Sequence, residues 1–274
     1  MKKPNLTVVN NPWQELRQFT DARIALGRSG VSLPTSAQLA FQLAHARARD
    51  AVHLRLDVKA LTNSLRDADP DVHCIVVSSA AGNRDTYLQR PDLGRRLNAA
   101  SRTMLLELHQ SHPPHESYDL SIVIADGLSA LAIAQNAQPF LDALMAKLAP
   151  DNLSLAPLTI VQQGRVAIGD EVGEIFNAKM VVILIGERPG LSSPDSMGLY
   201  LTWAPRVGLT DESRNCISNV RPAGLSYEEA AVKLHYLLTQ ALRRQLSGIL
   251  LKDETGAAAG LTPPPERNFL LEKR

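Results

Sequence analysis

The sequence predicts an α/β protein with a doubly wound, mostly parallel sheet that follows an N-terminal helical segment. Two observations predict this fold. Short, nearly all-apolar runs recur along the chain, as buried parallel strands require, at residues 120–125, 158–161, 180–185 and 199–203. Segments whose apolar residues have helical spacing separate most of these runs. Alternation of this kind over residues 119–250 is typical of a parallel sheet with helices on both faces.

The composition of the 274 residues excludes several classes of protein. The 29 lysines and arginines nearly balance the 28 aspartates and glutamates, which removes the electrostatic argument for nucleic-acid binding. No apolar run is long enough to span a membrane, and no apolar core of a signal peptide follows the first lysines. The two cysteines, Cys74 and Cys216, provide neither a disulfide framework nor a zinc set. We therefore expect a protein of a reducing cytoplasm.

Residues 1–110 are expected to form an arm and a helical segment with a short pair of strands. Within this region, residues 13–24 could form a short helix. Thr35 can cap a longer helix, and Gln38 lies at the spacing that a capping box requires. The basic side chains within residues 47–49 suit the C-terminal end of that helix.

The pair of strands is expected at residues 72–78, which are rich in β-branched side chains, and at residues 85–89. Pro91 and Asp92 then indicate a helix start, and the proline-rich residues 112–115 close this helix. The apolar residues expected on one face of the helix are Leu93, Leu97, Ala100, Met104 and Leu108.

Residues 119–250 are expected to form a Rossmann-like domain. Ser129 starts a helix that Pro139 interrupts or restarts, and residues 169–176 form a shorter helix. The last long helix begins at a capping box at residues 226–229 and stops near Gly248. The side chains that it would bury are Ala231, Leu234, Leu238 and Leu242.

Residues 253–274, which include three consecutive prolines, are expected to form a flexible tail. The sequence contains no internal repeat. The predicted organisation is therefore an N-terminal region, one α/β domain and a tail.

Common catalytic and nucleotide-binding motifs are absent from the sequence. It has no Walker-type phosphate loop, no Gly-x-Gly-x-x-Gly fingerprint and no Gly-x-Ser-x-Gly elbow. Asp71 and His73 begin a cobalt-binding signature of the form Asp-x-His-x-x-Gly, but Val76 occupies the position of the glycine. We therefore expect neither catalytic residues nor metal ligands in this chain.

The turn after the apolar run 180–185 is the most informative stretch of the chain. It places Glu187 and Arg188 between Gly186 and Gly190. Ligands collect at strand tips in α/β sheets, and glycine lets the backbone approach a ligand closely. The turn is therefore a candidate ligand site, and an ordinary polar loop is the alternative.

Three further segments could contribute to the same site. Residues 126–129 follow a predicted strand, and the alternative there is a turn with Ser129 as a helix cap. Residues 163–166 follow another strand, where Arg165 could meet an anion or simply lie in a surface turn. Cys216 lacks a nearby histidine in the sequence, so a small buried side chain is the alternative to a functional one.

A cluster of arginines surrounds the turn at Asp92. Arg90, Arg95 and Arg96 repel one another unless carboxylates or carbonyls satisfy them, and Asp92 can serve only one or two. Arginine suits carboxylates at interfaces better than lysine does. We expect this turn to meet a partner subunit or to order the fold beside it, and a solvated helix start is the alternative.

Seven segments in a fixed order resemble one known family. They are residues 86–97, 122–129, 163–179, 183–191, 200–206, 214–220 and 247–250, which with the spacers between them span about 160 residues. The ordered set resembles the small (light) subunit of ethanolamine ammonia-lyase, an adenosylcobalamin-dependent enzyme.

The resemblance implies a division of labour between two subunits. A large subunit, a β/α barrel, would hold ethanolamine and act on it, and the two subunits would assemble into a larger hetero-oligomer. The small subunit would cover adenosylcobalamin, which keeps its own base on cobalt, in agreement with the incomplete signature at His73. Ethanolamine would become acetaldehyde and ammonia by a radical mechanism, and the small subunit would be inactive alone.

The cofactor-binding positions that the resemblance implies are Val166, Glu187 and Cys216, on loops after strands that could converge at one edge of the sheet. It also implies a bacterial cytoplasmic enzyme, inside a microcompartment in members with a longer N-terminal extension than this sequence has. Two alternatives stay open: a stand-alone nucleotide-binding or regulatory α/β module, and a purely structural assembly partner.

Overall fold

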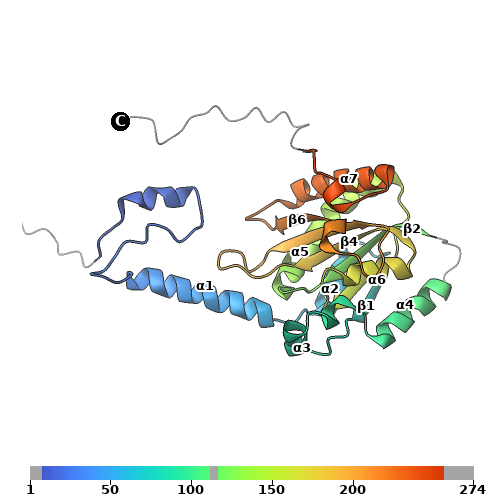
Figure 1. Cartoon of the computed structure of the whole chain (residues 1–274), viewed down its shortest axis with the longest axis horizontal. Coiled ribbons are helices and arrows are strands. Elements are labelled where there is room, and N and C mark those ends of the chain that lie inside the picture. The colour runs from blue at the N-terminus through green and yellow to red at the C-terminus, as the bar shows by residue number, and fades with distance from the viewer. Residues whose placement is uncertain (1–7, 112–116, 256–274) are drawn as a thin grey trace, which may run out of the picture.

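The computed structural model describes residues 8–111 and 117–255, and these contain a six-stranded sheet with the order β1-β3-β2-β4-β5-β6 (Figure 1). The strands are β1 (Cys74–Ser78), β2 (Tyr118–Ala125), β3 (Leu158–Gln162), β4 (Ala178–Gly186), β5 (Met197–Trp203) and β6 (Arg214–Val220). The neighbours β1, β3, β2 and β4 are parallel, whereas β5 and β6 add antiparallel pairings. The predicted α/β class is confirmed, and the complete sheet is mixed.

Helices cover both faces of the sheet. They are α1 (Thr35–His53), α2 (Val58–Ala68), α3 (Arg84–Gln89), α4 (Ala99–Ser111), α5 (Ala130–Leu148), α6 (Ile168–Ile175) and α7 (Tyr227–Arg244). Short 3-10 helices are η1 (Pro12–Gln18), η2 (Leu93–Arg95), η3 (Ala149–Asp151), η4 (Asp211–Ser213) and η5 (Gly248–Leu250). One apolar core packs α2, α5 and α7 against the sheet, and the other packs α4 and α6 against the opposite face.

The central strands are apolar throughout because both of their faces are buried. In β4, Met180, Val182 and Leu184 point to the first core, and the intervening Val181 and Ile183 point to the second. Side chains alternate between the faces of a strand, so two helical layers require a continuous apolar run. This confirms the interpretation of residues 180–185.

The face that carries α4 and α6 is covered only in part. The buried side chains of that core come from β1 to β4 and their helices, and Tyr200 of β5 is only partly buried against it. On β6, Cys216 and Ser218 are exposed. Among the described residues, no helix lies over this part of β5 and β6, which we call the open face.

Several predicted helix boundaries are confirmed. Ser129 caps α5 by accepting a hydrogen bond from the Ala132 N–H, and Ser226 and Glu229 form a complete capping box at α7. The interruption expected at Pro139 was wrong, because α5 continues through this residue without a break. Trp13 lies within η1, a 3-10 helix shorter than the helix predicted there.

Other boundaries were wrong. Thr35 does not cap α1: Pro34 occupies the N-cap position and no side chain caps the helix. Residues 85–89 form a helix rather than a strand, because the Asn83 side chain accepts a hydrogen bond from the Thr86 N–H and so caps α3. The helix expected from Pro91 begins only at Ala99, after the 3-10 turn η2.

The face predicted for α4 was wrong in part, because Leu108 packs against the core but Ala100 and Met104 are exposed. Leu105 is its fully buried residue, whereas Met104 is 40% exposed. Leu97 is buried ahead of the helix, where it forms a bridge with Ser79. The predicted closing residues 112–115 lie outside the described part of the chain.

The N-terminal arm stands apart from the sheet (Figure 1). It comprises η1, α1 and the segments that join them, residues 8–53, and we use "the arm" for this range. β1, which lies within the predicted N-terminal region, pairs with β3 in the common sheet. The division into regions and the flexible tail stay predictions, since residues 256–274 are outside the described part.

Candidate functional site

Three loops meet at the carboxyl edge of β2, β3 and β4. The Leu128 N–H donates to the Gly186 carbonyl at 2.9 Å, and the Gly164 N–H donates to the Asp126 carboxylate at 3.1 Å. Glycine permits this approach: a Cβ on Gly127, whose φ is +57°, would lie 2.2 Å from the Gly186 carbonyl oxygen. The segments that the sequence singled out after these strands therefore lie in direct contact.

Asp126 lies at the centre of this edge and is only 2% exposed. Its burial raises the pKa of the carboxyl to about 6, while hydrogen bonds from the backbone of Gln163 and Gly164 and the charge of Arg84 act in the opposite direction. The Arg84 guanidinium lies 3.9 Å from the carboxylate. Asp126 thus ties the β2 and β3 loops together rather than facing a ligand.

An aromatic ring between two arginines holds the loop after β3. The Tyr87 ring centroid lies 4.8 Å from the Arg84 guanidinium carbon and 4.3 Å from that of Arg165. The Tyr87 hydroxyl donates to the Gly164 carbonyl at 3.1 Å, and Arg165 donates back to the Tyr87 carbonyl at 3.2 Å. Arg165 therefore has a structural role in positioning its neighbour Val166.

Val166 is half-buried, and it packs against the same apolar core as Tyr200. It follows β3 on the side of the sheet that α6 covers. Its apolar side chain therefore lies on the same face of the sheet as Tyr200.

Glu187 lies beside the open face, next to β5. Its carboxylate accepts a hydrogen bond from the Ser196 hydroxyl and another from the Asn219 N–H at 3.3 Å. A Cβ on Gly198 would lie 2.9 Å from one Glu187 oxygen, so the carboxylate rests against the first part of β5. The carboxylate is half-buried and keeps acceptor capacity for a further donor.

Cys216 was expected on a loop, but it lies within β6, a strand that the sequence analysis did not predict. It pairs with Tyr200 across the antiparallel β5–β6 ladder. Its thiol is exposed and lies 3.3 Å from the Ser218 hydroxyl. The alternative of a small buried side chain is therefore wrong.

Tyr200 lies beside Cys216 and Glu187 and is a further candidate residue, which the sequence analysis did not single out. Burial raises the pKa of its hydroxyl, and the neighbouring Cys216 thiol and Glu187 carboxylate raise it further. Its ring packs on the core that Val166 also borders. The segment 200–206 in the family resemblance was the available signal, because it begins at this tyrosine.

Other singled-out residues lie elsewhere. Asp71 and His73 line a hollow of about 730 Å³ at the amino edge of the sheet, opposite the three loops. Arg188 is exposed at the tip of its turn. In the described residues, no group of His, Cys, Asp and Glu could hold a metal ion, and no helix could cross a membrane.

The arginine turn lies beside the three loops. Arg90 and Asp92 form an exposed ion pair at 2.7 Å. The side chains of Arg95 and Arg96 are exposed. The contact of this turn with a partner subunit stays a prediction.

Comparison with known proteins identifies close relatives. The family model described as ethanolamine ammonia-lyase light chain matches residues 10–252. The chain is 60% identical to the ethanolamine ammonia-lyase small subunit of Azotobacter vinelandii, over 95% of this chain and 96% of the relative. It is 57% identical to the small subunit of Ralstonia nicotianae, over 97% and 96%, and 57% identical to that of Pseudomonas aeruginosa strain PAO1, over 96% and 95%.

Proposed function

The chain belongs to the ethanolamine ammonia-lyase light-chain family, and from this premise we propose that it holds adenosylcobalamin against the large catalytic subunit. As a small subunit it is part of a heteromeric lyase, and its partner is the large subunit. The reaction proposed for the complete enzyme is the conversion of ethanolamine to acetaldehyde and ammonia in the bacterial cytoplasm, within or outside a microcompartment.

The observation that carries the proposal is the cluster at the open face. Glu187, Tyr200 and Cys216 lie together at the part of the sheet that no described helix covers. Val166 packs against the same core as Tyr200. An uncovered sheet face offers more contact area to a large planar ring than a narrow pocket would. The residues present therefore fit a corrin cofactor.

Each side chain has a role that follows from its chemistry. The Glu187 carboxylate would accept a hydrogen bond from an amide of the cofactor, since Ser196 and Asn219 use only part of its acceptor capacity. Val166 and the Tyr200 ring would supply apolar contact. The exposed Cys216 thiol would contribute weakly polar surface.

The small subunit would bind and orient the cofactor, and it would transfer no proton in the reaction. When bound, adenosylcobalamin supplies radical chemistry through homolysis of its cobalt–carbon bond. The described residues of the open face include no histidine, and its one carboxylate is already held by two donors. Substrate binding and amine chemistry are therefore assigned to the large subunit.

Replacement of Glu187 by alanine tests the proposal in the assembled enzyme. The loss of one charge-assisted hydrogen bond should weaken cobalamin binding by about ten- to a hundredfold, with subunit assembly unchanged. The matched control is Glu228→Ala, which removes an exposed carboxylate from the first turn of α7. Equal cofactor dissociation constants for Glu187→Ala, Glu228→Ala and the wild type would refute the assignment and favour a purely structural partner.

A further inference from the structure

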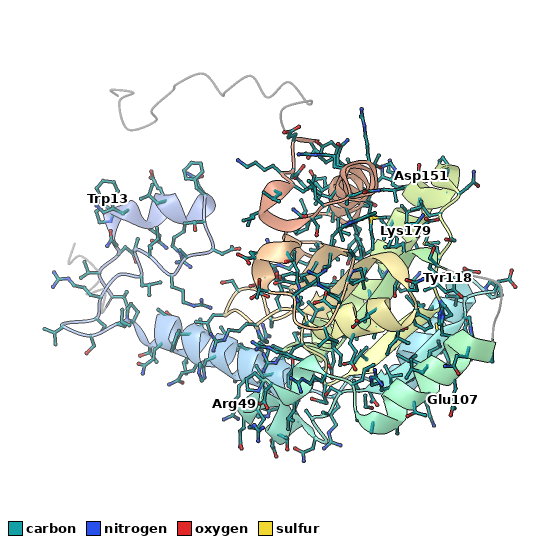
Figure 2. The ribbon with its side chains drawn as sticks, turned by 45° about the vertical axis from the view of Figure 1, so that its right-hand side comes forward. Trp13, Arg49, Glu107, Tyr118, Asp151 and Lys179 are labelled. Carbon is teal, nitrogen blue, oxygen red and sulfur yellow. The ribbon has the colours of Figure 1, made fainter. Side chains whose placement is uncertain are left out.

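The arm exposes an unusual amount of apolar surface for its length. Trp13 is 59% exposed and stands far from the sheet on η1 (Figure 2). Of the eighteen large apolar side chains that are exposed in the described chain, ten belong to the arm, so exposed apolar surface concentrates there. The ten are Val8, Val9, Trp13, Phe19, Ile24, Val31, Leu33, Leu39, Phe41 and Leu43.

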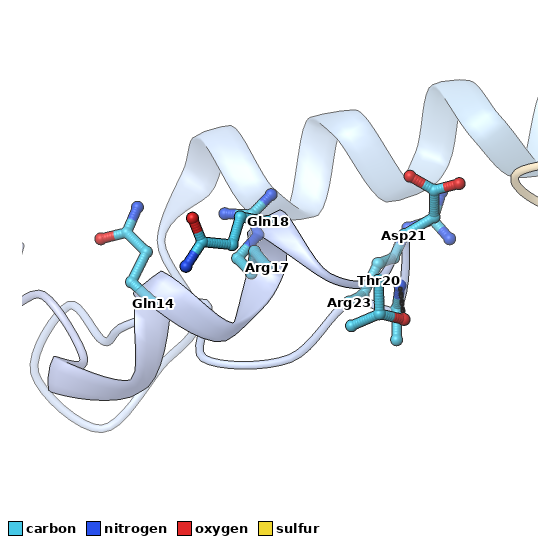
Figure 3. Close-up of a pocket in the computed structure, with 7 residues that line it drawn as sticks. Gln14, Arg17, Gln18, Thr20, Asp21 and Arg23 are labelled. Carbon is cyan, nitrogen blue, oxygen red and sulfur yellow. Dashed lines mark hydrogen bonds between the residues drawn. The ribbon is translucent and has the colours of Figure 1, made fainter. Parts of the chain in front are cut away.

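The arm does not bury these side chains against itself. A hollow of about 420 Å³ separates η1 from the segment that follows it, with Gln14, Gln18 and Asp21 in its lining (Figure 3). A second hollow of about 420 Å³ lies between η1 and α1. The buried apolar side chains of α1 are Ala48 and Ala51, at its C-terminal end. Helical stability in proteins comes mostly from packing, so this arrangement calls for an external partner.

The arm is rooted at the edge of the sheet that carries the proposed cofactor residues. Arg84 donates to the Val52 carbonyl at the end of α1 and to the Gly127 carbonyl of the β2 loop, both at 2.7 Å. Arg23 donates to the Leu191 carbonyl at 3.4 Å, in the loop that begins with Glu187. A partner that covers the open face would therefore be adjacent to the arm.

The charge of the arm indicates the chemistry of that partner. Residues 8–53 contain five arginines and three acidic residues, a net charge of +2. None of the ion pairs in the described part of the chain involves these arginines. Arg47 and Arg49 are exposed beside the apolar residues of α1. An apolar surface bordered by carboxylates would complement this combination.

We propose that the arm is a second docking element for the large subunit, which would receive Leu39 and Leu43 of α1 in an apolar surface bordered by carboxylates. The two leucines lie one helical turn apart and are 58% and 52% exposed. The inference rests on the proposed function, because continuity with the open face identifies the large subunit as the occupant. A second copy of this chain is the competing occupant.

The test uses the co-expressed complex of both subunits without added cofactor. The variant Leu39→Gln/Leu43→Gln keeps good helix formers in α1 and removes the apolar contact. The control is Val232→Gln/Leu250→Gln, which replaces two exposed apolar residues, 44% and 67% exposed, outside the arm. Mass photometry over a dilution series measures the concentration at which the small subunit leaves the large one.

The arm variant should dissociate at roughly ten- to a hundredfold higher concentration than the wild type, with the control within about twofold. Unchanged dissociation of the arm variant, or an equal effect of the control, would overturn the inference. Breakdown into smaller species that still contain both subunits would identify a second copy as the occupant and would also overturn it.

A second measurement, of cobalamin binding, distinguishes failure of this inference from failure of the proposed function. At subunit concentrations well above the dissociation midpoint, the arm variant should bind cobalamin with the wild-type dissociation constant. The Glu187→Ala variant should show the reverse, weakened cobalamin binding with wild-type assembly.

Discussion

The carboxyl group of Asp126 has almost no contact with water, and its environment makes its ionisation a determinant of stability. Burial raises its pKa from 3.8 to about 6 in the folded chain, against the hydrogen bonds of the β3 loop and the charge of Arg84. Between these two values the folded state holds a proton that the unfolded state has lost. The free energy of unfolding therefore falls as the pH rises from about 4 to 6.

The variant Asp126→Asn should remove this pH dependence. Across that window the wild type should lose roughly 3 kcal/mol of stability relative to the variant, because one pKa unit corresponds to about 1.4 kcal/mol. Urea denaturation at a series of pH values, followed by the fluorescence of Trp203, measures the difference. A difference between the two proteins that stayed constant from pH 4 to 6 would contradict the raised pKa.

Individual site residues could be predicted from the sequence only where a loop follows a strand. Glu187 and Val166 were proposed in this way; Glu187 lies against β5, and Val166 packs on the core that Tyr200 also contacts. Cys216 was assigned to a loop, and Tyr200 was missed. Both residues lie in antiparallel strands, where they pair with each other. This pairing depends on the register of β5 against β6, which no local sequence pattern encodes.

At the scale of elements, the contact between the end of β4 and the start of α5 depends on glycine. A Cβ on Gly186 would lie 2.0 Å from the Ser129 carbonyl oxygen and 2.6 Å from that of Asp126, and both are backbone atoms. The N-terminus of α5 and the Glu187 turn can therefore approach this closely only without a side chain at residue 186.

The variant Gly186→Ala should destabilise the fold by about 1–3 kcal/mol and should displace Glu187 from β5. The control is Gly82→Ala, an exposed position where a Cβ would meet no atom within 4 Å. Thermal denaturation of both variants measures the effect. Equal melting temperatures for the two variants would show that the backbone can shift to accommodate a Cβ at this contact.

Predictions of elements succeeded where one local signal was strong and failed where two signals competed. The apolar runs of β2, β3 and β4 and the capping box at Ser226 predicted those elements correctly. Residues 85–89 show a mixed pattern, and the cap at Asn83 decided in favour of a helix. β6 has a polar composition and buries only every third residue, so its sequence shows no period-2 strand pattern and did not stand out from a loop.

At the scale of the whole molecule, the two proposals assign cofactor binding to the open face and subunit docking to the arm, and they leave the chemistry to the large subunit. The purified small subunit should therefore release no ammonia from ethanolamine when adenosylcobalamin alone is added, and activity should appear when the large subunit is added. An ammonia-release assay of the three mixtures decides the point. Turnover of ethanolamine by the small subunit with cofactor alone would refute the proposal that the large subunit carries out the chemistry.

The exposed apolar arm also has a consequence for how the two subunits must be produced. A copy of this chain without a partner displays Trp13, Phe19 and Leu39 to other proteins, and exposed apolar surface of this kind promotes aggregation. Excess small subunit would then be lost to precipitation or proteolysis, whereas matched synthesis would protect it. The yield of enzyme in a cell should accordingly follow the ratio at which the two subunits are translated.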